Sequence, residues 1–163
     1  MRNLPEAYLR SGLFGLQDGI VSTTGVVAGI SAGVSDKTII VLAALVAVSV
    51  EATSMAAGQY TSEKAAHQLD KSGKRQDNLI TGALIMFVSY FLAGMVPVLP
   101  TIILDQPGAR WVSIGAAFIA LFIIGYVKGK IVEHNALRSA IELFIIGGVA
   151  TTIGLIVGMI LKV

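Results

Sequence analysis

Residues 78–104 read NLITGALIMFVSYFLAGMVPVLPTIIL, a run without a single charged side chain. A helix on the surface of a soluble protein keeps one polar face, and an uncharged run of this length offers none. The run also exceeds the ~20 residues that a helix needs to cross the hydrocarbon core of a bilayer. The stretch therefore predicts a helix surrounded by lipid or by other buried helices.

Two further apolar blocks precede this run and two follow it. Hydrophobic residues make up 55% of the 163-residue chain and charged residues only 13%, a balance that is unusual for a soluble domain. We predict an all-α integral membrane protein with one transmembrane domain, residues 1–163, and a short cytosolic loop at 63–78. The predicted spans are residues 13–34, 38–60, 79–99, 111–127 and 141–161.

Lysine and arginine are distributed unequally between the two sides of this predicted bundle. A cytosolic N-terminus places nine of the twelve cations on the cytosolic side. Cytosolic loops of membrane proteins carry the excess of Lys and Arg. We therefore predict a cytosolic N-terminus and, after five spans, a C-terminus on the far side. The far side holds Lys37, Arg110 and Lys162, and the cytosolic side holds Arg2, Arg10, Lys64, Lys71, Lys74, Arg75, Lys128, Lys130 and Arg138.

Glycines recur at four-residue spacing in the first predicted span, as Gly15 and Gly19 and then as Gly25, Gly29 and Gly33. Such spacing forms a shallow groove that lets two helix backbones approach closely. A homodimer with this span at its interface is one interpretation, and packing within the subunit is the other. Similar pairs in the fourth and fifth spans are assigned to packing within the subunit: Gly125 with Gly129, and Gly154 with Gly158.

Only two ionisable side chains, Asp18 and Glu51, lie well inside the predicted spans. A charged side chain at the centre of a membrane helix costs ~2.5–3.5 kcal/mol on insertion scales, so such a residue commonly faces a cavity, a partner or an ion. Counted along their antiparallel helices, the two acids reach overlapping depths. Met55 follows Glu51 by one helical turn and therefore faces the same space.

The absence of cysteine restricts metal ligands to oxygen, imidazole and thioether groups. Carboxylates bind divalent cations in general, and a thioether adds preference for transition metals over Mg²⁺ and Ca²⁺. We predict a metal site at Asp18, Glu51 and Met55, with apolar packing as the alternative for Met55. Emptied carboxylates can take up protons, which would couple metal movement to proton movement. Residues of the candidate path or entry, or alternatively of a solvated helix end, are Ser54, Gln59, Ser62, Glu63, His67 and Asp70.

Other function classes fit parts of the sequence. A small proton-coupled exporter of organic cations would use a membrane carboxylate, but also a cage of aromatic rings, and the sequence predicts none near Glu51. An enzyme would need a nucleophile with a base, or a histidine-rich site; both histidines, His67 and His134, lie outside the predicted spans. We therefore expect no enzyme activity and no cofactor. A non-transporting membrane scaffold would not need the paired acids.

Two motifs carry a resemblance to a known family. The run DGIVST, residues 18–23, followed by SMAAGQYTS, residues 54–62, resembles the vacuolar iron transporter family, which includes yeast vacuolar and plant nodulin-like members. The similarity covers the five-span plan of the chain. Asp18 and Met55 match path residues of the family, whereas Glu51 depends on the physical argument above. Gln59 stands where the family often has glutamate.

The resemblance implies a dimeric, proton-coupled exporter of Fe²⁺ or Mn²⁺ from the cytosol, with its path between the first and second spans at the dimer interface. Expected partners are a second copy, the lipid bilayer, divalent metal ions and protons, and no nucleic acid. The expected location is the plasma membrane of a prokaryote, or a vacuolar or other internal membrane of a eukaryote. Many members carry a glutamate-rich cytosolic domain between the second and third spans, where this chain has only residues 63–78.

Overall fold

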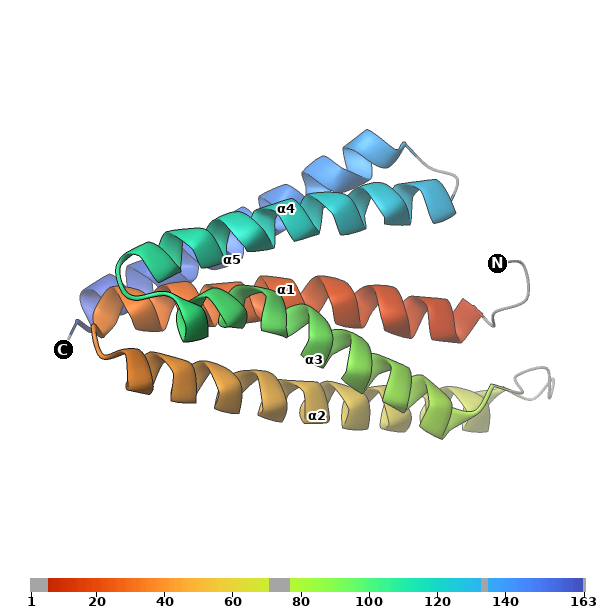
Figure 1. The fold of residues 1–163 in the computed structure, drawn as a ribbon. Helices are drawn as coiled ribbons and strands as arrows, with labels where there is room; N and C mark the ends of the chain where they lie inside the picture. Colours follow the sequence, from red (N-terminus) through yellow and green to blue (C-terminus); the bar gives the residue numbers. More distant parts are fainter. Residues whose placement is uncertain (1–5, 71–76, 133–134, 163) are drawn as a thin grey trace.

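The computed structural model describes residues 6–70, 77–132 and 135–162, and helix is the only regular secondary structure in these ranges. Five helices follow one another in a lengthwise bundle (Figure 1). All five are long and apolar enough to cross a membrane. The predicted all-α fold with five helices is therefore confirmed. The helices are α1 (Glu6–Gly33), α2 (Lys37–Leu69), α3 (Leu79–Ile103), α4 (Gly108–Ile131) and α5 (Ala136–Ile160).

Polar side chains fix the starts of three helices. The first N–H groups of a helix have no carbonyl partner within it, and a side-chain oxygen just before the helix supplies one. Asp36 does so for α2, Asn78 for α3 and Asn135 for α5. These caps allow the chain to reverse direction in short connections, so that consecutive helices pack against each other.

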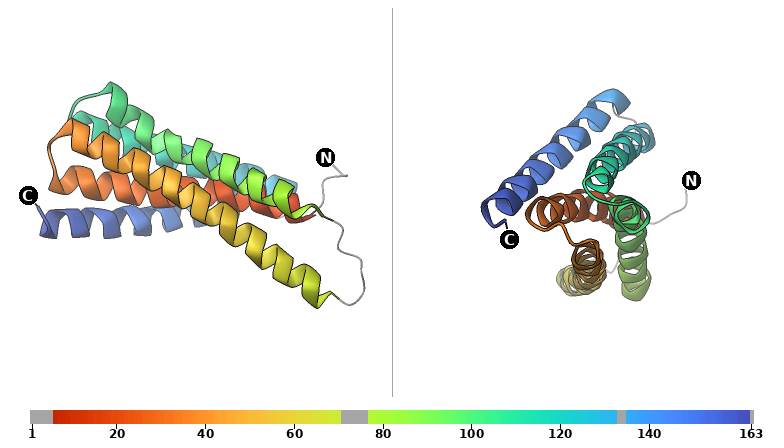
Figure 2. Two further views of the ribbon diagram at one scale, coloured as in Figure 1. Left: turned by 90° about the horizontal axis from the view of Figure 1, so that it is seen from below. Right: turned by 60° about the vertical axis from the view of Figure 1, so that its left-hand side comes forward.

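The first helix occupies the centre of the bundle. In Figure 1 α1 lies between α4 and α5 on one side and α2 and α3 on the other, and it contacts all four. In the most apolar 18-residue stretch of α1, 50% of the residues are buried, whereas this share is 28% or less in each of the other four helices. The start of α1 and the end of α5 lie at opposite ends of the bundle (Figure 2). We call the end where α1 begins and α2 finishes the N-terminal end, and the opposite end the C-terminal end.

Glycines permit this central position, because α1 packs directly on the backbones of its neighbours. A Cβ atom on Gly29 or on Gly33 would lie 2.8 Å from the backbone oxygen of Gly154 or of Gly158 in α5. Gly25 faces α5 in the same way, while Gly15 and Gly19 face the backbone of α3. The structure thus shows packing within the subunit for these glycines, and the homodimer interpretation stays a prediction. The pairs in α4 and α5 pack within the subunit as predicted: Gly125 and Gly129 face α5, and Gly154 and Gly158 face α1.

Substitution of Gly29 by valine will separate α1 from α5, because the new Cβ atom would lie only 2.8 Å from the backbone oxygen of Gly154. Overpacking of this kind costs about 1–3 kcal/mol. The expected result is a lower thermal unfolding midpoint of the purified protein in detergent. Gly115→Val is the matched control, since nothing lies within 4 Å of a Cβ at that position. Equal midpoints for the two variants would contradict the close packing.

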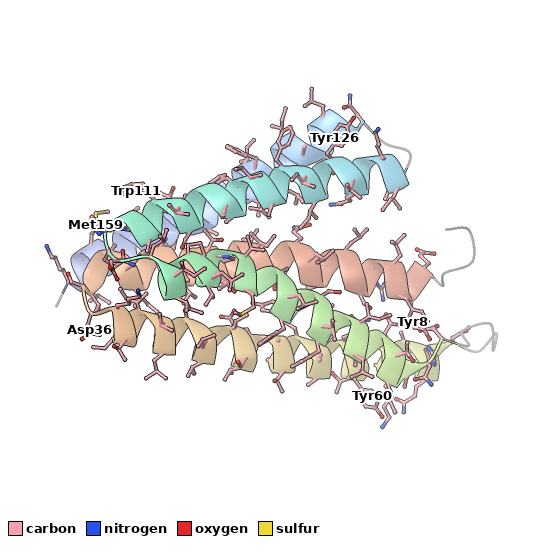
Figure 3. All side chains as sticks on the ribbon, viewed as in Figure 1. Tyr8, Asp36, Tyr60, Trp111, Tyr126 and Met159 are labelled. Carbon is pink, nitrogen blue, oxygen red and sulfur yellow. The ribbon has the colours of Figure 1, made fainter. Side chains whose placement is uncertain are left out.

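The outside of the bundle is apolar along the helices and carries aromatic rings toward its ends. Leu42 in α2 is 62% exposed and Ile119 in α4 is 64% exposed, two of many such side chains. Continuous apolar surface of this kind is typical of contact with lipid. Figure 3 shows Tyr8 and Tyr60 toward the N-terminal end and Trp111 at the C-terminal end. Tyrosine and tryptophan are enriched at both membrane–water interfaces.

The largest difference from the predicted spans concerns α2. This helix continues to Leu69, so residues 63–69 of the predicted loop are helical, and residues 71–76 lie outside the described ranges. Hydropathy marks the part of a helix that lies in hydrocarbon, whereas the helix itself continues as long as its residues favour it. Glu63, Lys64, Ala65 and Ala66 are strong helix formers. They carry α2 beyond its apolar segment.

Candidate functional site

Glu51 lies where three helices meet in the middle of the bundle. Its carboxylate accepts hydrogen bonds from the hydroxyl of Ser22 in α1, at 3.0 Å, and from the hydroxyl of Tyr90 in α3. The two hydroxyl oxygens also lie within hydrogen-bond distance of each other, so either hydroxyl could donate to the other instead of to Glu51. Tyr90 is only 1% exposed and lies against the backbone of α1 at Gly19. The glycine thus lets α3 come near enough for its tyrosine to reach a carboxylate on α2.

Asp18 is the second acid of this centre. It lies half-buried on α1, one helical turn before Ser22, so it shares the side of α1 on which Ser22 reaches Glu51. Among the ion pairs of the described residues, neither acid has a cationic partner. The structure therefore brings the two predicted acids together in a place where a cation or a proton would relieve their repulsion.

Met55 lies one turn after Glu51 on α2 and is half-buried. Its side chain packs against the cluster of Val48, Ala52 and Tyr90. The predicted thioether is thus in apolar contact with the cluster that includes the tyrosine bonded to Glu51. Its position is compatible with both predicted roles, ligand and packing.

Sequence reasoning did not assign Ser22 and Tyr90 as partners of Glu51. Each position nevertheless carries a signal. Ser22 is four residues after Asp18, on the same side of α1, and belongs to the first motif. Tyr90 places a hydroxyl group in the middle of an uncharged span, where a buried tyrosine usually has a hydrogen-bond partner. The identity of that partner depends on helix packing, which the sequence alone does not supply.

A second polar cluster lies at the N-terminal end of the bundle. Glu63 of α2 is buried; its carboxylate pairs with the guanidinium of Arg10 in α1 and accepts a hydrogen bond from Gln59, at 3.4 Å. The Nε2 atom of His67 lies 3.3 Å from a carboxylate oxygen of Asp77, just before α3. One potential ligand atom from each of Glu63, His67 and Asp77 lies within 4.8 Å of the other two.

The remaining predicted path residues lie along α2. The structure groups Glu63 and His67 with Asp77, and it places Asp70 at the C-terminal cap of α2, where the Asp70 N–H bonds to backbone oxygens of the last turn. Ser54 and Ser62 are exposed. A pocket of about 390 Å³ lies between α1 and α2 at this end. Its lining residues are Arg10, Phe14, Gln59, Ser62, Glu63 and Ala66.

One row of side chains joins the two clusters. Its members are four residues apart and form a ridge that winds slowly around α2. The row covers ~24 Å along the helix axis at 1.5 Å per residue. From the bundle centre to the N-terminal end, its members are Glu51, Met55, Gln59, Glu63 and His67.

The fold and the two clusters define a class of protein: a small helical bundle with the dimensions to cross a membrane and an acidic polar centre. Comparison with protein families assigns the chain to one family within this class. A family model described as the VIT family matches residues 9–80 and 69–159. The chain belongs to the VIT family, which confirms the resemblance seen in its motifs.

Individual relatives differ in how much of the chain they match. An uncharacterised protein of Methanocaldococcus jannaschii is 30% identical over 159 residues, covering 85% of this chain and 82% of that protein. Vacuolar iron transporter homolog 2 of Arabidopsis thaliana is 23% identical over 161 residues, covering 91% of this chain and 82% of the relative. Vacuolar iron transporter 1 of Oryza sativa subsp. japonica is 34% identical over 73 residues, which are 44% of this chain and 29% of the rice protein.

Proposed function

We propose that the chain carries a divalent transition metal, Fe²⁺ or Mn²⁺, out of the cytosol in exchange for protons. The observation that carries this proposal is that Glu51 contacts α1 at Ser22, one helical turn from Asp18, inside a bundle with an apolar exterior. Two carboxylates in such a place are costly unless a cation or protons compensate them. The names of the rice and Arabidopsis relatives, which call them vacuolar iron transporters or homologues, point to iron as the cargo.

The groups at the centre have separate roles in this proposal. Asp18 and Glu51 supply oxygen ligands to the ion, and Met55 supplies a thioether that favours a transition metal over Mg²⁺ and Ca²⁺. Ser22 and Tyr90 orient the carboxylate of Glu51 through their hydrogen bonds. Partners of this kind hold a ligand in place and raise metal affinity, as they do around other metal sites.

Proton exchange follows from the same two acids. When the metal leaves, the carboxylates repel each other again, and proton uptake removes that repulsion. When the next ion binds, those protons leave. Each acid therefore alternates between the two cargoes, which makes metal flow in one direction drive proton flow in the other.

The topology that we propose places the N-terminal end in the cytosol, as the positive charges favour. The protein is then an integral membrane protein of the plasma membrane or of an internal membrane. We place the contact of a homodimer at an apolar groove of about 620 Å³ along α1 and α5. Ser22, Gly25, Gly29 and Gly33 line this groove, so a second copy would lie next to a residue that binds Glu51.

A competition assay tests the proposed cargo. In proteoliposomes with an outward proton gradient, that is, with the more acidic solution inside, we expect uptake of Mn²⁺. Fe²⁺ and Co²⁺ should inhibit this uptake strongly and Mg²⁺ and Ca²⁺ weakly, whereas tetraethylammonium should not inhibit it. Met55→Leu keeps the volume and removes the sulfur, so the preference for Fe²⁺ over Mg²⁺ should fall while Mn²⁺ uptake persists. Inhibition by tetraethylammonium, with none by Fe²⁺, would instead support an exporter of organic cations.

A further inference from the structure

The cluster at the N-terminal end contains the donor atoms of a second metal site. Glu63 and His67 lie one turn apart on α2, and Asp77 reaches them from the chain segment that enters α3. The three side chains are mostly buried: the exposed fractions are 4% for Glu63, 23% for His67 and 14% for Asp77. They are therefore held together by helix packing.

The spacing of the donors is close to that of ligands around a single ion. Oxygen and nitrogen ligands lie about 2.0–2.2 Å from a transition metal, so two of them lie up to ~4 Å apart. The three ligand atoms here are within 4.8 Å of one another, so small side-chain rotations would bring them to the spacing of ligands around one ion. An imidazole beside two carboxylates suits Mn²⁺, Fe²⁺ or Zn²⁺, whereas Mg²⁺ and Ca²⁺ take oxygen ligands.

The imidazole of His67 provides independent support. Its Nε2 atom is shielded from solvent and, within the described part of the chain, has no hydrogen-bond partner. Asp77 is 3.3 Å away, near enough for an ion pair but without the geometry of a hydrogen bond. Buried polar atoms in proteins nearly always have a partner. A metal ion between the imidazole and the two carboxylates would provide one.

Arg10 forms an ion pair with one of the three proposed ligands, Glu63. The guanidinium of Arg10 pairs with the carboxylate of Glu63, while the Arg10 side chain is 61% exposed. Both residues also line the pocket of about 390 Å³ between α1 and α2, which gives the carboxylate a route to solvent. A divalent ion and Arg10 would compete for the same oxygens, and an exposed arginine is free to move away.

We propose that Glu63, His67 and Asp77 bind one divalent transition metal ion, and that Arg10 neutralises Glu63 when the ion is absent. The inference rests in part on the proposed function, because such a site would load ions onto the row of α2 that leads to Glu51. The exchange of Arg10 for metal would keep Glu63 neutralised in both states. Binding is measurable without transport, so the two ideas fail separately.

The test is Mn²⁺ binding to the purified full-length protein, measured from free Mn²⁺ by electron paramagnetic resonance. The Asp18→Asn variant serves as background, because it weakens the central site. We expect one bound Mn²⁺ per chain in this background, with affinity falling on the order of tenfold or more after His67→Ala or Asp77→Asn is added. Asp105→Asn, at the opposite end of the bundle, is the control with the same change of charge, and it should bind as the background does.

Arg10→Gln distinguishes competition from a merely structural ion pair. Removal of a competing cation should tighten Mn²⁺ binding several-fold, whereas loss of a structural support would weaken it or leave it unchanged. Unfolding midpoints of all variants must match the background for these comparisons. Absence of Mn²⁺ binding in the Asp18→Asn background, with normal wild-type transport, overturns the second site alone. Binding at His67 and Asp77 without transport by the wild type overturns the proposed function alone.

Discussion

Replacement of Asp18 by asparagine will nearly abolish metal transport while the protein stays folded. Asparagine has almost the same volume as aspartate but lacks its charge, so the ion loses one of its two central carboxylates. Uptake of Mn²⁺ into proteoliposomes should fall by roughly tenfold or more, as when a metal site loses a supporting group. The unfolding midpoint should equal or exceed that of the wild type, because asparagine removes a costly charge from inside the bundle.

Asp105→Asn is the matched control for this substitution. It makes the same chemical change at the C-terminal end of the bundle, where Asp105 is 90% exposed and pairs with Lys37 at 2.9 Å. Exposed ion pairs contribute about 0–1 kcal/mol to stability. This variant should therefore transport normally and unfold nearly as the wild type does. Normal transport by both variants would remove Asp18 from the path.

Two substitutions of Glu51 will separate its charge from its hydrogen bonds. Glu51→Gln keeps an oxygen that accepts from Ser22 and Tyr90, so we expect a nearly unchanged unfolding midpoint together with a loss of transport as large as that of Asp18→Asn. Glu51→Ala removes the shared acceptor as well; one of the hydroxyls of Ser22 and Tyr90 can then donate to the other, but the second loses its acceptor. An unsatisfied buried group costs about 1–3 kcal/mol, so this variant should also unfold earlier.

Thermal unfolding and Mn²⁺ uptake measured on the same preparations give the comparison. Tyr90→Phe is a useful control, because it removes one donor to Glu51 but keeps the charge and the ring. It should reduce transport less than Glu51→Gln does. Full transport by Glu51→Gln would show that Glu51 serves only to hold α1, α2 and α3 together.

The fold was predictable because lipid imposes a simple rule on sequence. An uncharged run such as residues 78–104 has no place on a soluble surface, and five long apolar blocks in all predict five helices. The packing partners of each helix were harder to predict from the sequence. Glycines at four-residue spacing indicate close backbone contact but do not specify with which helix, and the structure gives Gly29 to α5 and Gly19 to α3. That choice depends on the shapes of all the helices together.

Some residues of the candidate site were likewise predictable from the sequence, and others were not. Asp18 and Glu51 are identifiable from sequence because acids are costly inside a membrane, and local spacing on one helix adds Met55 and His67. Tyr90 and Asp77 are not identifiable by spacing, since they lie on α3 and on the segment just before it, and they reach the site only through tertiary packing. The sequence offered Asp70 as the neighbour of His67, and the structure groups His67 with Asp77.

Simultaneous measurement of metal and proton flux in one proteoliposome preparation tests the central claim most directly. With dyes for Mn²⁺ and for pH enclosed in the vesicles, an outward proton gradient should accelerate Mn²⁺ uptake by the wild type. Added Mn²⁺ should in turn drive protons out of the vesicles, and Asp18→Asn should abolish both effects. Mn²⁺ uptake that ignores the proton gradient and persists in Asp18→Asn would contradict exchange through the paired acids.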